Sequence, residues 1–207
     1  IPERLRPFLK DVLSVSSAEI EYARRKAIVE KNPFAIGNME DADEEIKKLA
    51  VTLNPEVIRV IKSPSEALQL FAVRKKGRMI KFLPDATDAV KIAALANEGC
   101  AISEISNPTY EMKMAAVRCS WVAIGLIEDP SEELQLLAVS VNGEALCFIK
   151  NPSERVQEIA LFNNGLAIQH IRKPSKRFQL IAVKSNPNSI LHLKSPDEEV
   201  LLTALRG

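Results

Sequence analysis

A period of 22 residues runs through most of this chain and restricts the folds open to it. The stretch DPSEELQLLAVSVNGEALCFIK (129–150) is followed by NPSERVQEIALFNNGLAIQHIR (151–172), which has the same pattern. Positions equivalent to Pro130 recur every 22 residues without insertion. The residue eight positions after each of them is always alanine. These alanines are Ala50, Ala72, Ala94, Ala116, Ala138, Ala160, Ala182 and Ala204. A residue this small at every repeat predicts close contact between helices.

Each unit begins with a pattern typical of a helix start. In Asp129-Pro130-Ser131-Glu132 a side chain that can cap a helix precedes Pro, and Glu follows two residues later. We expect Asp129 to be the cap and Pro130 the first helical residue. Apolar residues then recur at helical spacing. Polar residues such as Gln135 and Gln157 share one position in successive units, and we expect them to form a column exposed to solvent.

A second, shorter helix is predicted in the second half of each unit, where Ile or Leu recurs three residues apart, as in Ile168 and Ile171. Between the two helices several units have Asn-Gly, and glycine in the left-handed conformation commonly closes a helix. Other units have Pro33, Pro55 or Pro187 at the glycine position. Proline cannot adopt positive φ, so either the turn varies or this position opens the second helix.

A two-helix unit of this length cannot bury its own apolar face and must stack on its neighbours. The sequence therefore predicts an all-α fold, an α-solenoid or superhelix of stacked two-helix repeats. We expect residues 1–19 to form an N-terminal capping segment and residues 20–207 to form about eight and a half repeats in one domain. The last unit has apolar Leu201 and Leu202, which predict contact with a further repeat, a partner or a second copy.

The recurring pattern NPSEEVQ-x-x-AV-x-x-NG-x-AI-x-x-I resembles short helical repeats of bacterial and bacteriophage proteins. It is similar in its logic to leucine-rich repeat variant and HEAT-like solenoids. The resemblance covers residues 20–207 and implies an architecture, but it implies no activity, because such scaffolds serve many partners. Nothing in the chain matches the cysteine-rich iron-sulfur segment of the leucine-rich repeat variant prototype.

The charge balance, the cysteine content and the absence of catalytic motifs further restrict the classes of function that we expect. The 28 Lys and Arg nearly balance the 27 Asp and Glu, so no overall field attracts nucleic acid or an anionic membrane. No apolar run is long enough to span a bilayer. Three cysteines without a C-x-x-C pair favour a reducing, cytoplasmic location. No phosphate-binding or hydrolase motif occurs, and we expect a non-enzymatic protein without a cofactor.

Candidate partner-binding residues are those that depart from the repeat pattern. Trp121 occupies the position that is Gly or Pro in the other units, and it could anchor a partner or fold over a neighbouring repeat. Tyr110 replaces the Glu of its unit and could belong to the same surface. One helix start carries four cations, which could bind an acidic partner or phosphate or could simply be solvated. These cations are Arg172, Lys173, Lys176 and Arg177.

A second basic cluster lies in RKKGRMIK and could contact nucleic-acid phosphates. Its cations are Arg74, Lys75, Lys76, Arg78 and Lys81. His170 and His192 share one position in successive units and should be neighbours; we interpret them as packing residues and expect no metal site. The sequence thus favours a scaffold, adaptor or inhibitor that binds a protein along its solenoid surface. Nucleic-acid binding through the basic cluster is the alternative.

Overall fold

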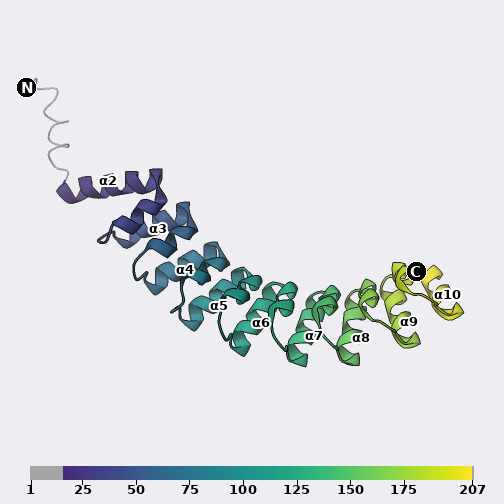
Figure 1. The fold of residues 1–207 in the computed structure, drawn as a ribbon. Coiled ribbons are helices and arrows are strands. Elements are labelled where there is room, and N and C mark those ends of the chain that lie inside the picture. Colours follow the sequence, from purple (N-terminus) through teal and green to yellow (C-terminus); the bar gives the residue numbers. More distant parts are fainter. Residues whose placement is uncertain (1–15, 207) are drawn as a thin grey trace, which may run out of the picture.

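The computed structural model describes residues 16–206, in which α-helices alternate with 3-10 helices (Figure 1). The α-helices are α2 (Ser17–Lys31), α3 (Glu44–Leu53), α4 (Glu66–Lys75), α5 (Asp88–Asn97), α6 (Tyr110–Cys119), α7 (Glu132–Val141), α8 (Glu154–Asn163), α9 (Lys176–Ser185) and α10 (Glu198–Arg206). The 3-10 helices are η2 (Pro33–Asn38), η3 (Pro55–Val60), η4 (Gly77–Phe82), η5 (Gly99–Glu104), η6 (Trp121–Leu126), η7 (Gly143–Phe148), η8 (Gly165–His170) and η9 (Pro187–His192).

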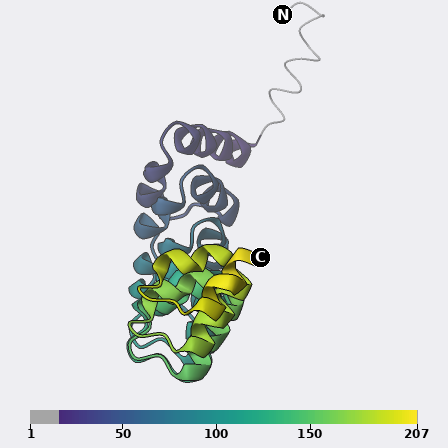
Figure 2. The ribbon, with the colours of Figure 1, turned by 90° about the vertical axis from the view of Figure 1, so that its right-hand side faces the viewer.

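The units stack in sequence order into a curved, extended solenoid (Figure 1). Each α-helix packs on the α-helices of the adjacent units, and each 3-10 helix packs on the adjacent 3-10 helices. The two kinds of helix therefore form separate layers (Figure 2). The predicted all-α solenoid of two-helix repeats is confirmed, and the second helix of each unit is a 3-10 helix. The core lies between the two layers and contains the alanine column, which is fully buried from Ala50 to Ala182.

The α-helices start two residues later than the sequence pattern predicts. Ser131, and not Asp129, is the N-cap of α7, because its hydroxyl accepts a hydrogen bond from the Leu134 N–H. Pro130 lies before the cap, and the preceding Asp129 has a φ of 44°. The motif contains two side chains that can cap a helix, and a residue before Pro is disfavoured in the helical region. The equivalent caps are Asp43, Ser65, Thr87, Thr109, Ser153 and Ser175.

The column that contains Gln135 and Gln157 is not simply solvated, which corrects the expectation from the sequence. Both side chains are half-buried, and each amide donates to the carbonyl oxygen of the proline in its own unit. The distance is 2.8 Å from Gln135 Nε2 to the Pro130 oxygen and 2.8 Å from Gln157 Nε2 to the Pro152 oxygen. Gln69 and Gln179 make the same bond. These glutamines hold the loop that enters each α-helix.

The glycine between the two helices does not close the α-helix in the left-handed conformation. Asn142 is extended, Gly143 opens η7, and none of the described glycines has positive φ. The glycine position opens the second helix in every unit, which explains why Pro33, Pro55 and Pro187 fit there. Glycine is needed at position 143 for another reason. A Cβ there would lie 2.4 Å from the carbonyl oxygen of Ala160 in the next unit.

Side-chain hydrogen bonds connect neighbouring units at this close approach. The Asn163 amide donates to the Ser140 carbonyl (3.0 Å), and its oxygen accepts the Gly143 N–H (2.8 Å). Asn97 bridges Arg74 and Gly77 in the same way. The units are thus held in register by polar contacts as well as by burial of apolar surface.

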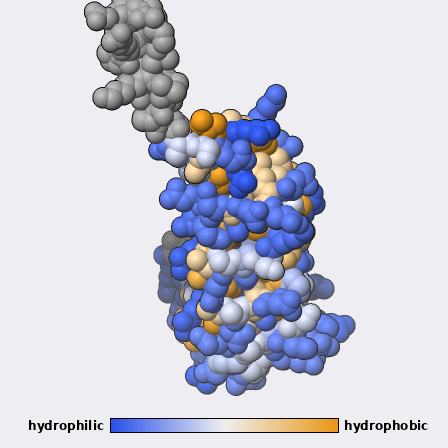
Figure 3. Space-filling view, turned by 90° about the vertical axis from the view of Figure 1, so that its left-hand side faces the viewer, coloured by the Kyte–Doolittle hydropathy of each residue, from blue (hydrophilic) through white to orange (hydrophobic). Residues whose placement is uncertain are grey.

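The two ends of the described chain differ from the internal units. Helix α2 has 15 residues and begins with a capping box between Ser16 and Glu19, so it extends across the predicted boundary at residue 19. Most of the predicted capping segment, residues 1–15, lies outside the described residues. Figure 3 shows this end, where apolar side chains appear among hydrophilic ones around α2. Ile20 and Ile28 are exposed there.

Candidate protein-interaction surface

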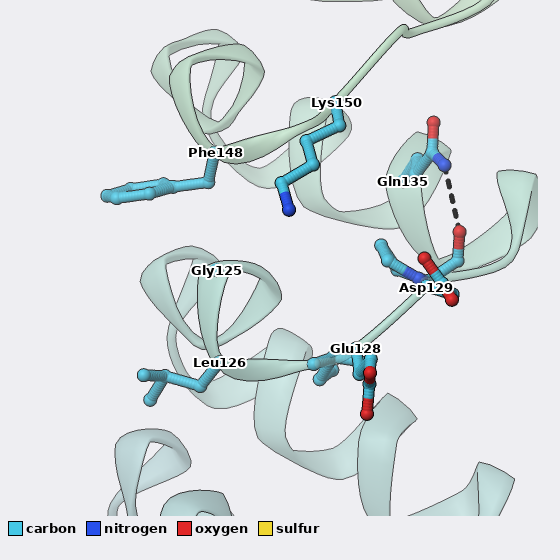
Figure 4. A pocket seen from close by; sticks show the side chains of 9 residues that line it. Gly125, Leu126, Glu128, Asp129, Gln135, Phe148 and Lys150 are labelled. Carbon is cyan, nitrogen blue, oxygen red and sulfur yellow. Dashed lines mark hydrogen bonds between the residues drawn. The ribbon is translucent and has the colours of Figure 1, made fainter.

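Two large apolar side chains are exposed side by side at the ends of neighbouring 3-10 helices. Leu126 ends η6 and is 49% exposed, and Phe148 ends η7 and is 43% exposed. The two residues hold the same position in successive units, so their side chains point the same way from the solenoid (Figure 4). Neighbouring exposed apolar side chains of this size favour contact with another molecule.

Trp121 and Gly125 set the position of Phe148. The Trp121 and Phe148 ring centroids are 5.9 Å apart with an interplanar angle of 42°. Trp121 is half-buried against the core and supports the Phe148 ring from its side. A Cβ at Gly125 would lie 2.9 Å from Cδ1 of Phe148, so the absence of a side chain at Gly125 leaves room for the ring. Phe148 is therefore held by contacts with the preceding unit.

An open groove of about 520 Å³ lies beside this apolar pair. Leu126 and Phe148 form one side, and Glu128 and Asp129 lie in the loop that follows η6. The Lys150 side chain extends from its loop into the space between the two units (Figure 4). A second groove of about 610 Å³ lies on the other side of the 126–129 segment. The surface thus offers an apolar contact with charges of both signs next to it.

The structure separates the two aromatic residues singled out in the sequence. Tyr110 is the first residue of α6, whereas Trp121 follows the other end of that helix, about 16 Å away at the rise of an α-helix. The Tyr110 hydroxyl donates to Glu133 at 2.6 Å, and this bond raises the pKa of Tyr110. Trp121 belongs to the apolar surface, and Tyr110 does not.

The four cations around the start of α9 also divide into two groups. Lys176 contacts Asp197 (3.0 Å) and Glu199 (2.6 Å) of the next unit, and Arg177 forms an ion pair with Glu158 of the preceding unit. The hydrogen bonds to Glu199 and Asp197 raise the pKa of Lys176. Arg172 and Lys173 are exposed and form no ion pair within residues 16–206. Of the four cations, Arg172 and Lys173 are therefore the two whose charge no carboxylate among residues 16–206 offsets.

The second basic cluster spans the end of α4 and most of η4. Lys76 pairs with Glu56 (3.0 Å) and Arg78 with Glu98 (2.8 Å), both in adjacent units. The Lys75 ammonium lies 5.6 Å from the Phe71 ring centroid, and that of Lys81 lies 4.8 Å from the Phe82 centroid. Arg74 forms no ion pair with any residue that the structure describes. Neighbouring carboxylates therefore offset part of this positive charge.

The histidines and cysteines hold no metal-like arrangement in the described part of the chain. His170 Nε2 lies 2.9 Å from Glu144, and His192 is exposed in the following unit. No group of three potential metal ligands occurs among residues 16–206. Cys100, Cys119 and Cys147 are unpaired, and burial raises the pKa of Cys147. None of the helices within the same residues is both long and apolar enough to cross a bilayer.

Sequence reasoning missed Leu126, Phe148 and Lys150 as surface residues. The position that holds Leu126 and Phe148 carries Glu104 and His170 in the flanking units. A position that varies in polarity between units faces solvent in a solenoid, because core positions stay apolar. Two large apolar residues in succession at such a position were the signal.

Comparisons with protein-family models, with curated proteins and with solved structures found no match to this chain. The class of protein is therefore defined by the fold and its surface alone. The protein is an all-helical repeat protein, built from stacked units of one α-helix and one 3-10 helix.

Proposed function

We propose that this protein is a non-enzymatic scaffold, adaptor or inhibitor that binds a protein partner along its solenoid surface. The observation that supports this most is the pair of exposed apolar residues, Leu126 and Phe148, beside an open groove. Trp121 supports the Phe148 ring from its side, and we propose that Leu126 and Phe148, rather than Trp121, make the main contact with the partner. A surface that is held in place by packing before binding loses less entropy when a partner docks.

The architecture supports this function in a second way. Solenoids present extended surfaces on which neighbouring units contribute successive contacts. The two grooves beside the 126–129 segment lie between consecutive units, and a similar groove lies beside His170 and Arg172, so a partner can engage several of them. A relationship to leucine-rich repeat variant or HEAT-like proteins, and a cytoplasmic location, are parts of this proposal.

Selection from a displayed library of random peptides on the immobilised protein tests the proposal. We expect enriched peptides whose affinity falls by about tenfold or more in Leu126→Ser and Phe148→Ser. Phe162→Ser is the matched control, because Phe162 is 61% exposed and lies on α8. Enriched peptides that bind both groove variants as well as the original protein would exclude this surface. A selection without enrichment would count against protein binding.

Nucleic-acid binding through Arg74, Lys75, Lys76, Arg78 and Lys81 is the second candidate function. It has less support, because Lys76 and Arg78 are already paired with carboxylates. Binding of a labelled oligonucleotide that weakens steeply with salt and is lost in Arg74→Glu/Lys75→Glu would favour it.

Self-association through α10 is a further part of the proposal. Leu201 and Leu202 are 44% and 43% exposed, and Leu205 is 84% exposed. The position of Leu205 is buried in the units from α3 to α9, where it holds Val51, Val73, Leu95, Val117, Val139, Leu161 and Val183. We propose that a second copy covers this apolar face.

A further inference from the structure

Positive charge recurs at one position in three successive units next to the apolar pair. Lys150, Arg172 and Lys194 each lie two residues after the end of a 3-10 helix, namely η7, η8 and η9. The same position holds Glu128 after η6. Because equivalent positions of stacked units lie in line along a solenoid, the three cations form a row. We call Lys150, Arg172, Lys194 and the adjacent Lys173 the basic ridge.

The basic ridge is available to an external ligand. All four side chains are exposed, and none forms an ion pair within residues 16–206. The ridge cations differ from Lys176 and Arg177, whose charges are offset by carboxylates of adjacent units. Lys150 lines the groove beside Phe148, and Arg172 lines the next groove along the chain, of about 510 Å³, together with His170.

The charge changes sign at the apolar pair. Glu128 and Asp129 lie beside Leu126 in the groove, whereas Lys150 follows Phe148 and the ridge continues through two more units. An occupant that places an apolar side chain on Leu126 and Phe148 therefore meets positive charge in one direction only. A uniform polyanion would be repelled by Glu128 and Asp129.

We propose that the partner contributes an extended, acidic segment, with an apolar anchor residue on Leu126 and Phe148 and carboxylates on the basic ridge. This inference rests on the proposed function, because it names the kind of partner segment that the same surface takes. Adjacent packed helices are about 8–10 Å apart, and an extended chain in the polyproline II conformation has three residues per turn and advances about 3.1 Å per residue, so every third side chain faces the same way. One carboxylate at every third residue therefore matches the repeat of the ridge.

Fluorescence polarisation with synthetic peptides tests this directly. The lead peptide has one Trp as the anchor and Glu at every third residue on one side, and a second peptide has the reverse order, since an extended segment can lie in either direction. Comparison peptides replace Glu by Gln, Glu by Lys, or Trp by Ser. We expect one of the two acidic orders to bind, with affinity about tenfold lower for the Gln version and lower again for the Lys version. Added salt should weaken the acidic peptide more than the Gln peptide.

Protein variants separate the ridge from general charge. Lys150→Glu/Arg172→Glu/Lys194→Glu should lose the preference for Glu over Gln peptides. The control, Lys48→Glu/Arg118→Glu/Lys184→Glu, makes the same change in net charge at exposed cations that form no ion pair with a described residue, and it should keep the preference. Circular dichroism of both variants checks that the helices remain.

Each outcome has a distinct meaning. If Glu and Gln peptides bind equally and both depend on Phe148, the ridge inference fails while the proposed function stands. If no peptide binds and the library selection also fails, both fail. If an oligonucleotide binds the ridge more tightly than any peptide, the partner is a nucleic acid and the inference is overturned.

Discussion

The Trp121 ring packs against Phe148 of the next unit, with centroids 5.9 Å apart, so a residue at the start of one 3-10 helix supports a residue at the end of the next. A double-mutant cycle with Trp121→Ala and Phe148→Ala should give a coupling energy of about 0.5–1.5 kcal/mol in urea unfolding. Trp121→Ala alone should lower the free energy of unfolding, because Trp121 is half-buried against the core. Additive effects of the two changes would contradict the supporting role of Trp121.

Gly143→Ala should destabilise the solenoid by about 1–3 kcal/mol, because the new methyl group would meet the backbone of Ala160 at 2.4 Å. The backbone at a packed helix end cannot move away without separating two units. Gly125→Ala is the control, since its nearest neighbour is the half-exposed and movable Phe148 side chain. The chemical denaturation midpoints of the two variants give the comparison, and an equal loss in both would contradict the close-approach explanation.

The contact of Lys176 with Asp197 predicts a pH-dependent contribution to stability. Lys176 lowers the pKa of Asp197, so this contribution is present above the ordinary pKa of an aspartate and is lost as the pH falls through the lowered value. We expect Lys176→Ala to lower the Tm at pH 7 and to have little effect once the pH is below the lowered pKa of Asp197. Lys173→Ala, which removes a cation without an ion pair within residues 16–206, should leave the Tm unchanged at both pH values. A Tm difference for Lys176→Ala that persists at low pH would contradict this explanation.

Leu205→Lys should reduce self-association measured by sedimentation velocity at increasing protein concentration. Leu205 is 84% exposed at a position that is buried in the units from α3 to α9, so a charge there makes covering by a second copy unfavourable. Leu53→Lys, at an exposed site on α3, is the control. A monomeric original protein, or equal association in both variants, would overturn the proposed contact.

Much of the fold was predictable because the same helix-forming pattern recurs in every 22-residue unit. Ala160 and its equivalents follow the same spacing in every unit, so helix position and stacking follow from pattern alone. The sequence pattern places the helix starts two residues early, because Asp129 and Ser131 are both capable of capping and only backbone geometry separates them. The pattern does not show that Gln135 is bonded to the Pro130 carbonyl, because this bond exists only once the loop is folded back.

The candidate surface was less predictable, because it depends on contacts between units. Trp121 stood out as an exception in the sequence, yet its role is to support Phe148, which the sequence did not single out. Arg172 and Arg177 looked alike in sequence, and only the folded chain shows that Glu158 offsets the charge of Arg177 while Arg172 lies in a groove. Ion pairs that join adjacent units require both residues to be placed in space.

The sequence by itself determined the class of fold: a 22-residue period with an invariant small residue permits a stack of helical units. The tertiary structure decided which residues are free to bind. The 22-residue pattern identifies the residues that each unit buries, because equivalent core positions are buried in unit after unit. Surface function arises from the non-repeating side chains, and their exposure, pairing and support depend on which neighbours the stacking brings beside them.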